Sequence, residues 1–126
     1  LYSEAANSLV DSLVNSQGDI HVVNTKNCGA LDFMAYDDVV ELPALVGRGA
    51  VTPIPVKGFD NQHIIGMMRT VKAYEKHAVK AALTGSRTEA LRAMAIHPLI
   101  GDFKAASQCF DEMLMAHREY LPQFFK

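Results

Sequence analysis

The residues that could carry catalysis or bind a metal ion are scattered through this chain of 126 residues. Its five histidines form no HxxxH or HExxH pattern, and no cysteine or carboxylate stands at a recognised metal-ligand spacing from them. We therefore expect each histidine to lie at the surface or to have its hydrogen bonds satisfied within the fold. The five are His21, His63, His77, His97 and His117.

The remaining reactive side chains also favour structural roles. Cys28 and Cys109 lie far apart and form no CxxC motif, so we expect both to be small, half-buried apolar residues. The adjacent carboxylates of Asp37 and Asp38 would point to opposite faces of an extended chain, which predicts a turn before a strand rather than an acid–base pair. Glycine-rich phosphate loops are also missing, because Gly47-Arg48-Gly49 lacks a strand-to-helix context.

Composition indicates one globular domain of ordinary chemistry. Hydrophobic residues make up 49% and charged residues 21%, and the formal net charge is −2, so no basic surface is expected to attract nucleic acid or acidic membranes. No apolar run approaches the roughly 20 residues that cross a bilayer. Two cysteines and no visible export signal indicate a reducing cytoplasm. Since the chain starts with Leu1 inside a helical pattern, we expect a fragment of a longer protein.

The first half of the sequence predicts a helix followed by a small sheet. Apolar residues recur with helical spacing from Ala5 to Val14, and Ser3 is a candidate N-cap. "NSQGD" should end that helix, and "IHVVNT" has the β-branched composition of a strand. "DDVVELPALVGRGAVTPIPV" then predicts further strands, joined by a hairpin loop at Gly47-Arg48-Gly49. Prolines at 43, 53 and 55 should lie at edges, bends or strand ends, because proline cannot donate to a sheet.

The second half predicts helices only. A long apolar stripe follows Gly58 and should stop at "TGS". Ser86 and Glu89 have the spacing of a capping box, which starts a helix expected to end near His97-Pro98. Asp102 should open the last helix and Pro122 should end it. The order of helix, small antiparallel sheet and then several helices predicts an α+β fold.

Several motifs, in order along nearly the whole chain, resemble the C-terminal part of glycoside hydrolase family 4, and most closely its 6-phospho-β-glucosidase branch. The family pattern runs YSxAA, IHxVNTxNxGxI, LPxDxVVExP, VKxYE and ALxxHPL. The matching segments here are "YSEAA", "HVVNTKNCGAL", "DDVVELPALV", "VKAYE" and "ALRAMAIHPLIGD". Two departures stand out: Cys28 replaces a frequent Asn, and Met34-Ala35 replaces Leu-Pro.

The resemblance implies a lactate/malate dehydrogenase-like C-terminal domain over 1–126, preceded in the longer protein by an NAD-binding Rossmann domain that is absent from this chain. The family hydrolyses 6-phosphoglycosides by oxidation and elimination, with NAD, a divalent metal such as manganese, and a tyrosine base, outside the usual two-carboxylate scheme. The implied parent enzyme is a cytoplasmic homo-oligomer whose substrate is a 6-phosphoglucoside, with no nucleic-acid or membrane partner.

The resemblance assigns no catalytic, cofactor-binding or metal-binding residue to this sequence, because the motifs that carry them are expected upstream. We therefore expect the fragment alone to be inactive and to bind neither cofactor. Tyr2, Ser3 and Glu4, followed by Asn24 and Asn27, are the residues expected to approach the substrate. The alternative is a non-enzymatic oligomerisation or interaction module that shares the fold.

Overall fold

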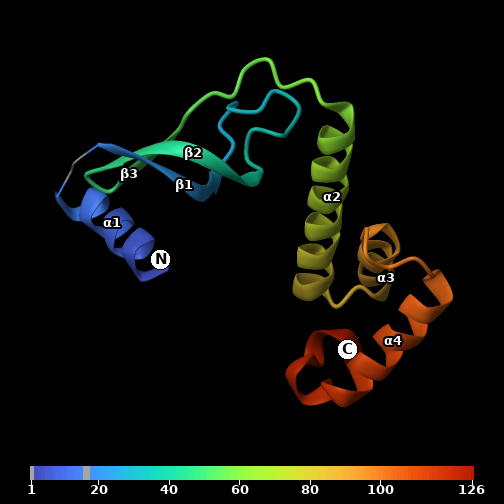
Figure 1. Ribbon diagram of the computed structural model, residues 1–126. Helices are drawn as coiled ribbons and strands as arrows, with labels where there is room; N and C mark the ends of the chain where they lie inside the picture. The colour runs from blue at the N-terminus through green and yellow to red at the C-terminus, as the bar shows by residue number, and fades with distance from the viewer. Residues whose placement is uncertain (1, 16–17) are drawn as a thin grey trace. The chain divides into compact units, whose positions relative to one another are not determined.

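The computed structural model describes residues 2–15 and 18–126, and the chain divides into two compact units. We call Leu1–Asp60 the sheet unit and Asn61–Lys126 the helical unit. Figure 1 shows both along the chain, from the blue N-terminus to the red C-terminus. No helix within the described residues is both long and apolar enough to cross a membrane.

The sheet unit contains one helix and a three-stranded antiparallel sheet in the order β1-β2-β3 (Figure 1). Its elements are α1 (Tyr2–Asn15), β1 (Asp19–Lys26), β2 (Val39–Gly47) and β3 (Ala50–Pro53). The helical unit contains three α-helices and two short 3₁₀ helices. These are α2 (Gln62–Thr84), α3 (Arg87–Ile96), α4 (Phe103–Ala116), η1 (Arg118–Tyr120) and η2 (Pro122–Phe125). The predicted α+β fold with a small antiparallel sheet and several helices is confirmed.

One face of the sheet forms the core of its unit. Side chains alternate across a strand, and the even-numbered residues of β2 from Val40 to Val46 are all buried. The register pairs Asp19 with Val46 and His21 with Ala44, so these two polar residues of β1 lie on the same face, with Asp19 exposed and His21 half-buried. Residues Ile20 and Val22 lie on the opposite face and are 65% exposed.

The predicted hairpin loop is confirmed. Arg48 and Gly49 connect β2 to β3 and both have positive φ, 44° and 70°. Two positive φ values are typical of the type I′ turn, whose twist matches that of antiparallel strands. The N–H of Gly49 also donates to the carbonyl of Leu13, 3.1 Å away, so the turn contacts α1.

Pro43 lies inside the central strand, so the prediction that it would lie at an edge, bend or strand end is wrong. Its carbonyl accepts a hydrogen bond from the N–H of Ile54 at 2.8 Å, one residue beyond the end of β3. In an antiparallel pair, the N and the carbonyl of one residue point to the same neighbour. The missing N–H of Pro43 therefore faces the point where β3 has ended. Pro53, the last residue of β3, and Pro55 lie where they were expected.

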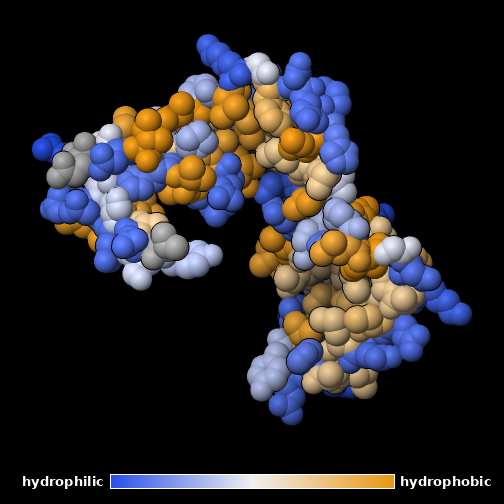
Figure 2. All heavy atoms as spheres, viewed as in Figure 1, coloured by the Kyte–Doolittle hydropathy of each residue, from blue (hydrophilic) through white to orange (hydrophobic). Residues whose placement is uncertain are grey.

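The helical unit packs its three helices around an apolar cluster. The helices α2 and α3 form an antiparallel pair joined at Gly85, and α4 packs against α3. Ala81, Ala90, Phe110 and Leu114 form the buried centre of the cluster, with Leu91, Met94, Leu121 and Phe124 partly buried around it. Figure 2 shows hydrophobic side chains also gathered on the visible surface of this unit.

Most predicted helix ends are confirmed, and two are wrong. Gly85 ends α2 with φ 69°, and the side chain of Asp102 caps α4 by accepting from the N–H of Ala105 at 2.8 Å. Ser3 is not a cap, because α1 already begins at Tyr2. The last α-helix ends at Ala116 rather than at Pro122, which instead starts η2.

Candidate functional site

The residues expected to approach a substrate lie at separate places in the sheet unit. Tyr2, Ser3 and Glu4 form the exposed first turn of α1, and Tyr2 is 95% exposed. The exposed side chain of Asn24 belongs to the face of β1 opposite to the face that contacts α1. The structure therefore does not bring Asn24 together with the start of α1, and the substrate role of these residues stays a prediction.

Asn27 is the centre of a compact loop, residues 27–38. Its side chain is fully buried, and its amide nitrogen donates to the carbonyls of Leu31, Met34 and Ala35 at 2.9, 3.1 and 3.1 Å. Its amide oxygen accepts from the N–H of Leu31 at 2.7 Å. Its backbone N–H donates to the carbonyl of Asp38 at 2.7 Å, which closes the two ends of the loop. These bonds give Asn27 a structural function that its sequence position did not reveal.

Other polar residues of this loop support the turn that was expected before β2. The carboxylate of Asp38 accepts from the N–H of Ala35 at 3.1 Å and is buried, whereas Asp37 is exposed. The carboxylate of Asp38 therefore stabilises the turn, whereas that of Asp37 lies at the surface. Cys28 is exposed with φ 48°, and Cys109 is exposed on α4, so the expectation that both cysteines are half-buried is wrong. The loop turns at position 28, and the thiol of Cys28 therefore points to solvent and not into the core.

Ser12 joins α1 to β1. Its side chain is fully buried, and its Oγ lies 2.9 Å from Asp19 Oδ2 and 2.8 Å from His21 Nε2. The carboxylate contacts the serine rather than the imidazole, so the order differs from a Ser-His-Asp triad, in which the histidine lies between the other two. Because the Ser12 hydroxyl is also inaccessible to solvent, we assign the cluster a structural role and not that of a catalytic nucleophile. The expectation of a satisfied histidine at His21 is confirmed.

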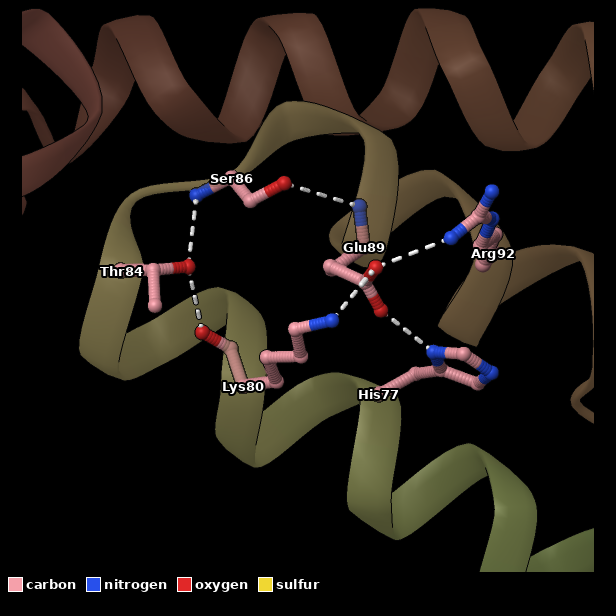
Figure 3. A network of polar contacts seen from close by, with 6 residues as sticks. All are labelled: His77, Lys80, Thr84, Ser86, Glu89 and Arg92. Atoms are coloured by element: carbon pink, nitrogen blue, oxygen red, sulfur yellow. Dashed lines mark hydrogen bonds and ion pairs between the residues drawn. The ribbon is translucent and has the colours of Figure 1, made fainter.

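Glu89 is the centre of a network of charged side chains from α2 and α3 (Figure 3). Its carboxylate lies 2.5 Å from His77 Nδ1 and 3.1 Å from Lys80 Nζ, both on α2, and 2.9 Å from Arg92 on α3. The hydrogen bond from His77, followed by that from Lys80, lowers the pKa of Glu89 from its ordinary 4.5 to about 2. The side chain is 7% exposed, so this anion is held between the two helices by cations.

The predicted capping box at the start of α3 is therefore half right. Ser86 Oγ accepts from the N–H of Glu89 at 3.3 Å, as expected. In a complete capping box, the side chain of Glu89 would accept a hydrogen bond from the backbone N–H of Ser86. Here Thr84 Oγ1 accepts that hydrogen bond instead, at an N···O distance of 3.3 Å (Figure 3). The Glu89 carboxylate instead contacts His77 and Lys80 of α2. The Ser-x-x-Glu spacing identified the residue, but only the packed helices reveal its partners.

An apolar pocket of about 450 Å³ lies within the helical unit. It is bordered by small side chains of α2 and α3, among them Ala78, Ala82 and Ala93, and by Phe124 of η2. His97 packs edge-on against Tyr74 with ring centroids 4.5 Å apart, and both rings line the pocket. Among residues 2–15 and 18–126, no three His, Cys, Asp or Glu side chains converge as a metal site.

Comparison with known proteins places the whole arrangement in one family. Residues 2–100 match the model of the family 4 glycosyl hydrolase C-terminal domain. The chain is 41% identical over 124 residues to a probable 6-phospho-beta-glucosidase of Bacillus subtilis, which covers 98% of this chain and 28% of that protein. It is 29% identical over 119 residues to the phospho-alpha-glucosidase PagL of Clostridium acetobutylicum, covering 94% of this chain and 26% of that protein.

Solved structures give the same result. The 6-phospho-beta glucosidase of Thermotoga maritima, determined with manganese, NAD+ and glucose-6-phosphate, superposes with a TM-score of 0.85 at 36% identity, over 95% of this chain and 29% of that one. A 6-phospho-alpha-glucosidase from gut microorganisms, in complex with NAD and Mn2+, gives 0.89 at 26% identity, over 97% and 28%. The chain thus spans less than a third of the length of these relatives, and it belongs to the family of family 4 glycosyl hydrolase C-terminal domains.

Proposed function

We propose that this chain is the C-terminal part of an NAD- and manganese-dependent 6-phospho-β-glucosidase that cleaves 6-phosphoglucosides by oxidation and elimination. The observation that carries the proposal is the 41% identity with a probable 6-phospho-beta-glucosidase over 98% of the chain. The relatives named as β-enzymes are 33 to 41% identical, against 29% for the α-enzyme. The fold does not distinguish a 6-phospho-β-glucosidase from a 6-phospho-α-glucosidase, since structures of both kinds of enzyme superpose well on this chain.

The described residues do not fit a metal site, because no three metal-ligating side chains converge among them. We therefore assign no catalytic step to this chain and place NAD and manganese binding in the rest of the longer enzyme. Within that enzyme, this chain would supply the scaffold on which a cytoplasmic homo-oligomer is built. The rival function, a non-enzymatic oligomerisation module, has no specific observation in its favour.

The longer protein that contains this sequence provides the test. It should release 4-nitrophenol from 4-nitrophenyl 6-phospho-β-glucoside when NAD and Mn²⁺ are both present, and a chelator should stop the reaction. The 6-phospho-α-glucoside is the matched control. Faster cleavage of the α-anomer would reject the β-assignment and keep the family, whereas no dependence on NAD would reject the proposed reaction.

A further inference from the structure

The Ser12 hydroxyl is the polar group that links α1 to the sheet. Ser12 is 0% exposed, and its Oγ contacts Asp19 Oδ2 and His21 Nε2 on β1, and the carbonyl of Ser8 one turn earlier at 3.0 Å. Asp19 and His21 are two residues apart, so they point to the same face of the strand. This is the face that also carries the buried Val46.

Counting hydrogens favours one direction for the hydrogen bond between Ser12 and His21. A serine hydroxyl carries one hydrogen, and the Ser8 carbonyl and an ionised Asp19 can only accept. If the hydroxyl donated to His21, these two acceptors would face its oxygen with no hydrogen between them. The arrangement that leaves fewest acceptors facing Oγ without a hydrogen has the hydroxyl donate to one of the two and His21 donate from Nε2 to Ser12 Oγ. This arrangement satisfies a fully buried hydroxyl.

Apolar packing holds α1 only in part, because Leu9 and Leu13 are half-buried. Among the residues of this helix, only Ser12 is buried, and the large side chains of Val10 and Val14 are 56% and 71% exposed. The other link we identify is the backbone hydrogen bond from Gly49 to Leu13. A segment with few buried apolar contacts opens at lower free energy than the core of its unit.

We propose that Ser12, Asp19 and His21 form a polar latch, and that α1 opens from the sheet as one unit when this latch is broken, while β1, β2 and β3 stay paired. Opening would uncover the end of the sheet face at Ala44 and Val46, which are both 0% exposed in the closed arrangement. The latch is thus a conformational device that controls access to an apolar strip. It does not depend on which reaction the longer enzyme catalyses.

Amide hydrogen exchange of the 126-residue chain tests the latch. In Ser12→Ala, the amides of α1 should exchange about tenfold faster or more, because Asp19 and the half-buried His21 lose the hydroxyl that links them to α1. The amides of β1 and β2 should keep their rates. Ser8→Ala is the matched control, since it changes the same residue type one turn earlier in the same helix, where the side chain is exposed. Unchanged α1 rates in Ser12→Ala, or equal acceleration in the strands, would overturn the proposal.

A second pair of variants serves if Ser12→Ala does not fold. His21→Gln keeps an N–H donor near the Nε2 position, and His21→Leu removes it. The latch predicts slow α1 exchange in the first and fast exchange in the second, and equal rates in the two variants contradict it. Nitrogen NMR of the unmodified chain adds a direct readout. A neutral His21 with its hydrogen on Nδ1 alone would overturn the hydrogen assignment and, with it, the latch.

Discussion

Gly85 faces the backbone of Gln123 so closely that a Cβ at position 85 would lie 1.8 Å from the Gln123 carbonyl oxygen. The side chain of Gln123 also donates to the carbonyl of Ala82 at 2.9 Å. The C-terminal segment thus packs against the turn between α2 and α3. Gly85 meets two requirements, a left-handed φ of 69° and room for a neighbouring backbone.

Gly85→Ala should therefore lose more stability than a positive φ alone explains. Gly58 is the matched control, because its φ is 72° and a Cβ there would meet nothing within 4 Å. We expect Gly58→Ala to cost about 1–2 kcal/mol through strain alone, and Gly85→Ala to cost at least about 1 kcal/mol more. Urea unfolding of both variants measures the difference. Equal losses would mean that η2 does not lie against Gly85 in solution.

Glu89 should make the stability of the helical unit depend on acidic pH. Because its folded pKa is about 2 and its ordinary value is 4.5, folding favours the ionised form. Its contribution is complete above pH 4.5 and is lost as the pH falls from there toward 2. Glu89→Gln should lower the unfolding midpoint at pH 7 and flatten this loss. Glu112→Gln, at an exposed glutamate of α4, is the control and should leave the acid profile unchanged.

Asn27→Asp should destabilise the sheet unit by at least about 2 kcal/mol, since a carboxylate cannot donate to the three carbonyls that the amide nitrogen contacts. Asn24→Ser, on the exposed face of β1, is the control and should change stability little, whereas an aspartate there would face Glu41. Denaturant unfolding distinguishes the two. A small loss at position 27 would indicate that the loop reorganises around another centre, and would return Asn27 to the candidates for substrate contact.

Cys28→Asn should be neutral or stabilising by up to about 1 kcal/mol, because asparagine tolerates positive φ better than most residues do. Position 28 has φ 48° and an exposed side chain. Thermal unfolding under reducing conditions compares the variant with the original chain, and Cys109→Asn, on a regular helix, gives the reference. A loss above about 2 kcal/mol at position 28 would require a buried role that the exposed thiol does not have.

Self-association of the chain is expected at micromolar concentration. Val10 and Val14 on α1 are 56% and 71% exposed, and Ile64 and Met67 on α2 are 41% and 50% exposed. Leu13 and Met68, which were expected to join these surfaces, are only half-buried. Exposed apolar area of this kind tends to find a partner, most often across a two-fold axis. Sedimentation equilibrium that gives the monomer mass over the whole concentration range would reject this prediction.

Local patterns in the sequence predicted the elements well because their signals are local. Gly85, Asp102 and the Arg48-Gly49 turn act through their own φ or through a backbone N–H a few residues away. Two of the errors arose where the packing of other elements decides. Pro43 lies in a central strand where β3 stops opposite to it, and the carboxylate of Glu89 contacts His77 and Lys80 of α2 instead of the N–H of Ser86.

The candidate site was less predictable for the same reason. Asn27 and Asn24 belong to the same strand-and-turn motif, yet one is fully buried and the other is exposed. Burial depends on how the loop closes from Asn27 to Asp38, a contact across eleven positions that no periodicity encodes. The polar contacts of Ser12 likewise need α1 and β1 to be packed together first.

The prolines of the sheet also give its two outer strands different tendencies to aggregate. Strand β3 has four residues, ends at Pro53 and is followed by Pro55, so it offers a short edge with few N–H donors. Strand β1, at the other side, has eight residues without proline and carries the exposed Ile20 and Val22. If copies of this chain join into fibrils, growth should therefore proceed along β1, and a proline or lysine placed at Val22 should suppress it.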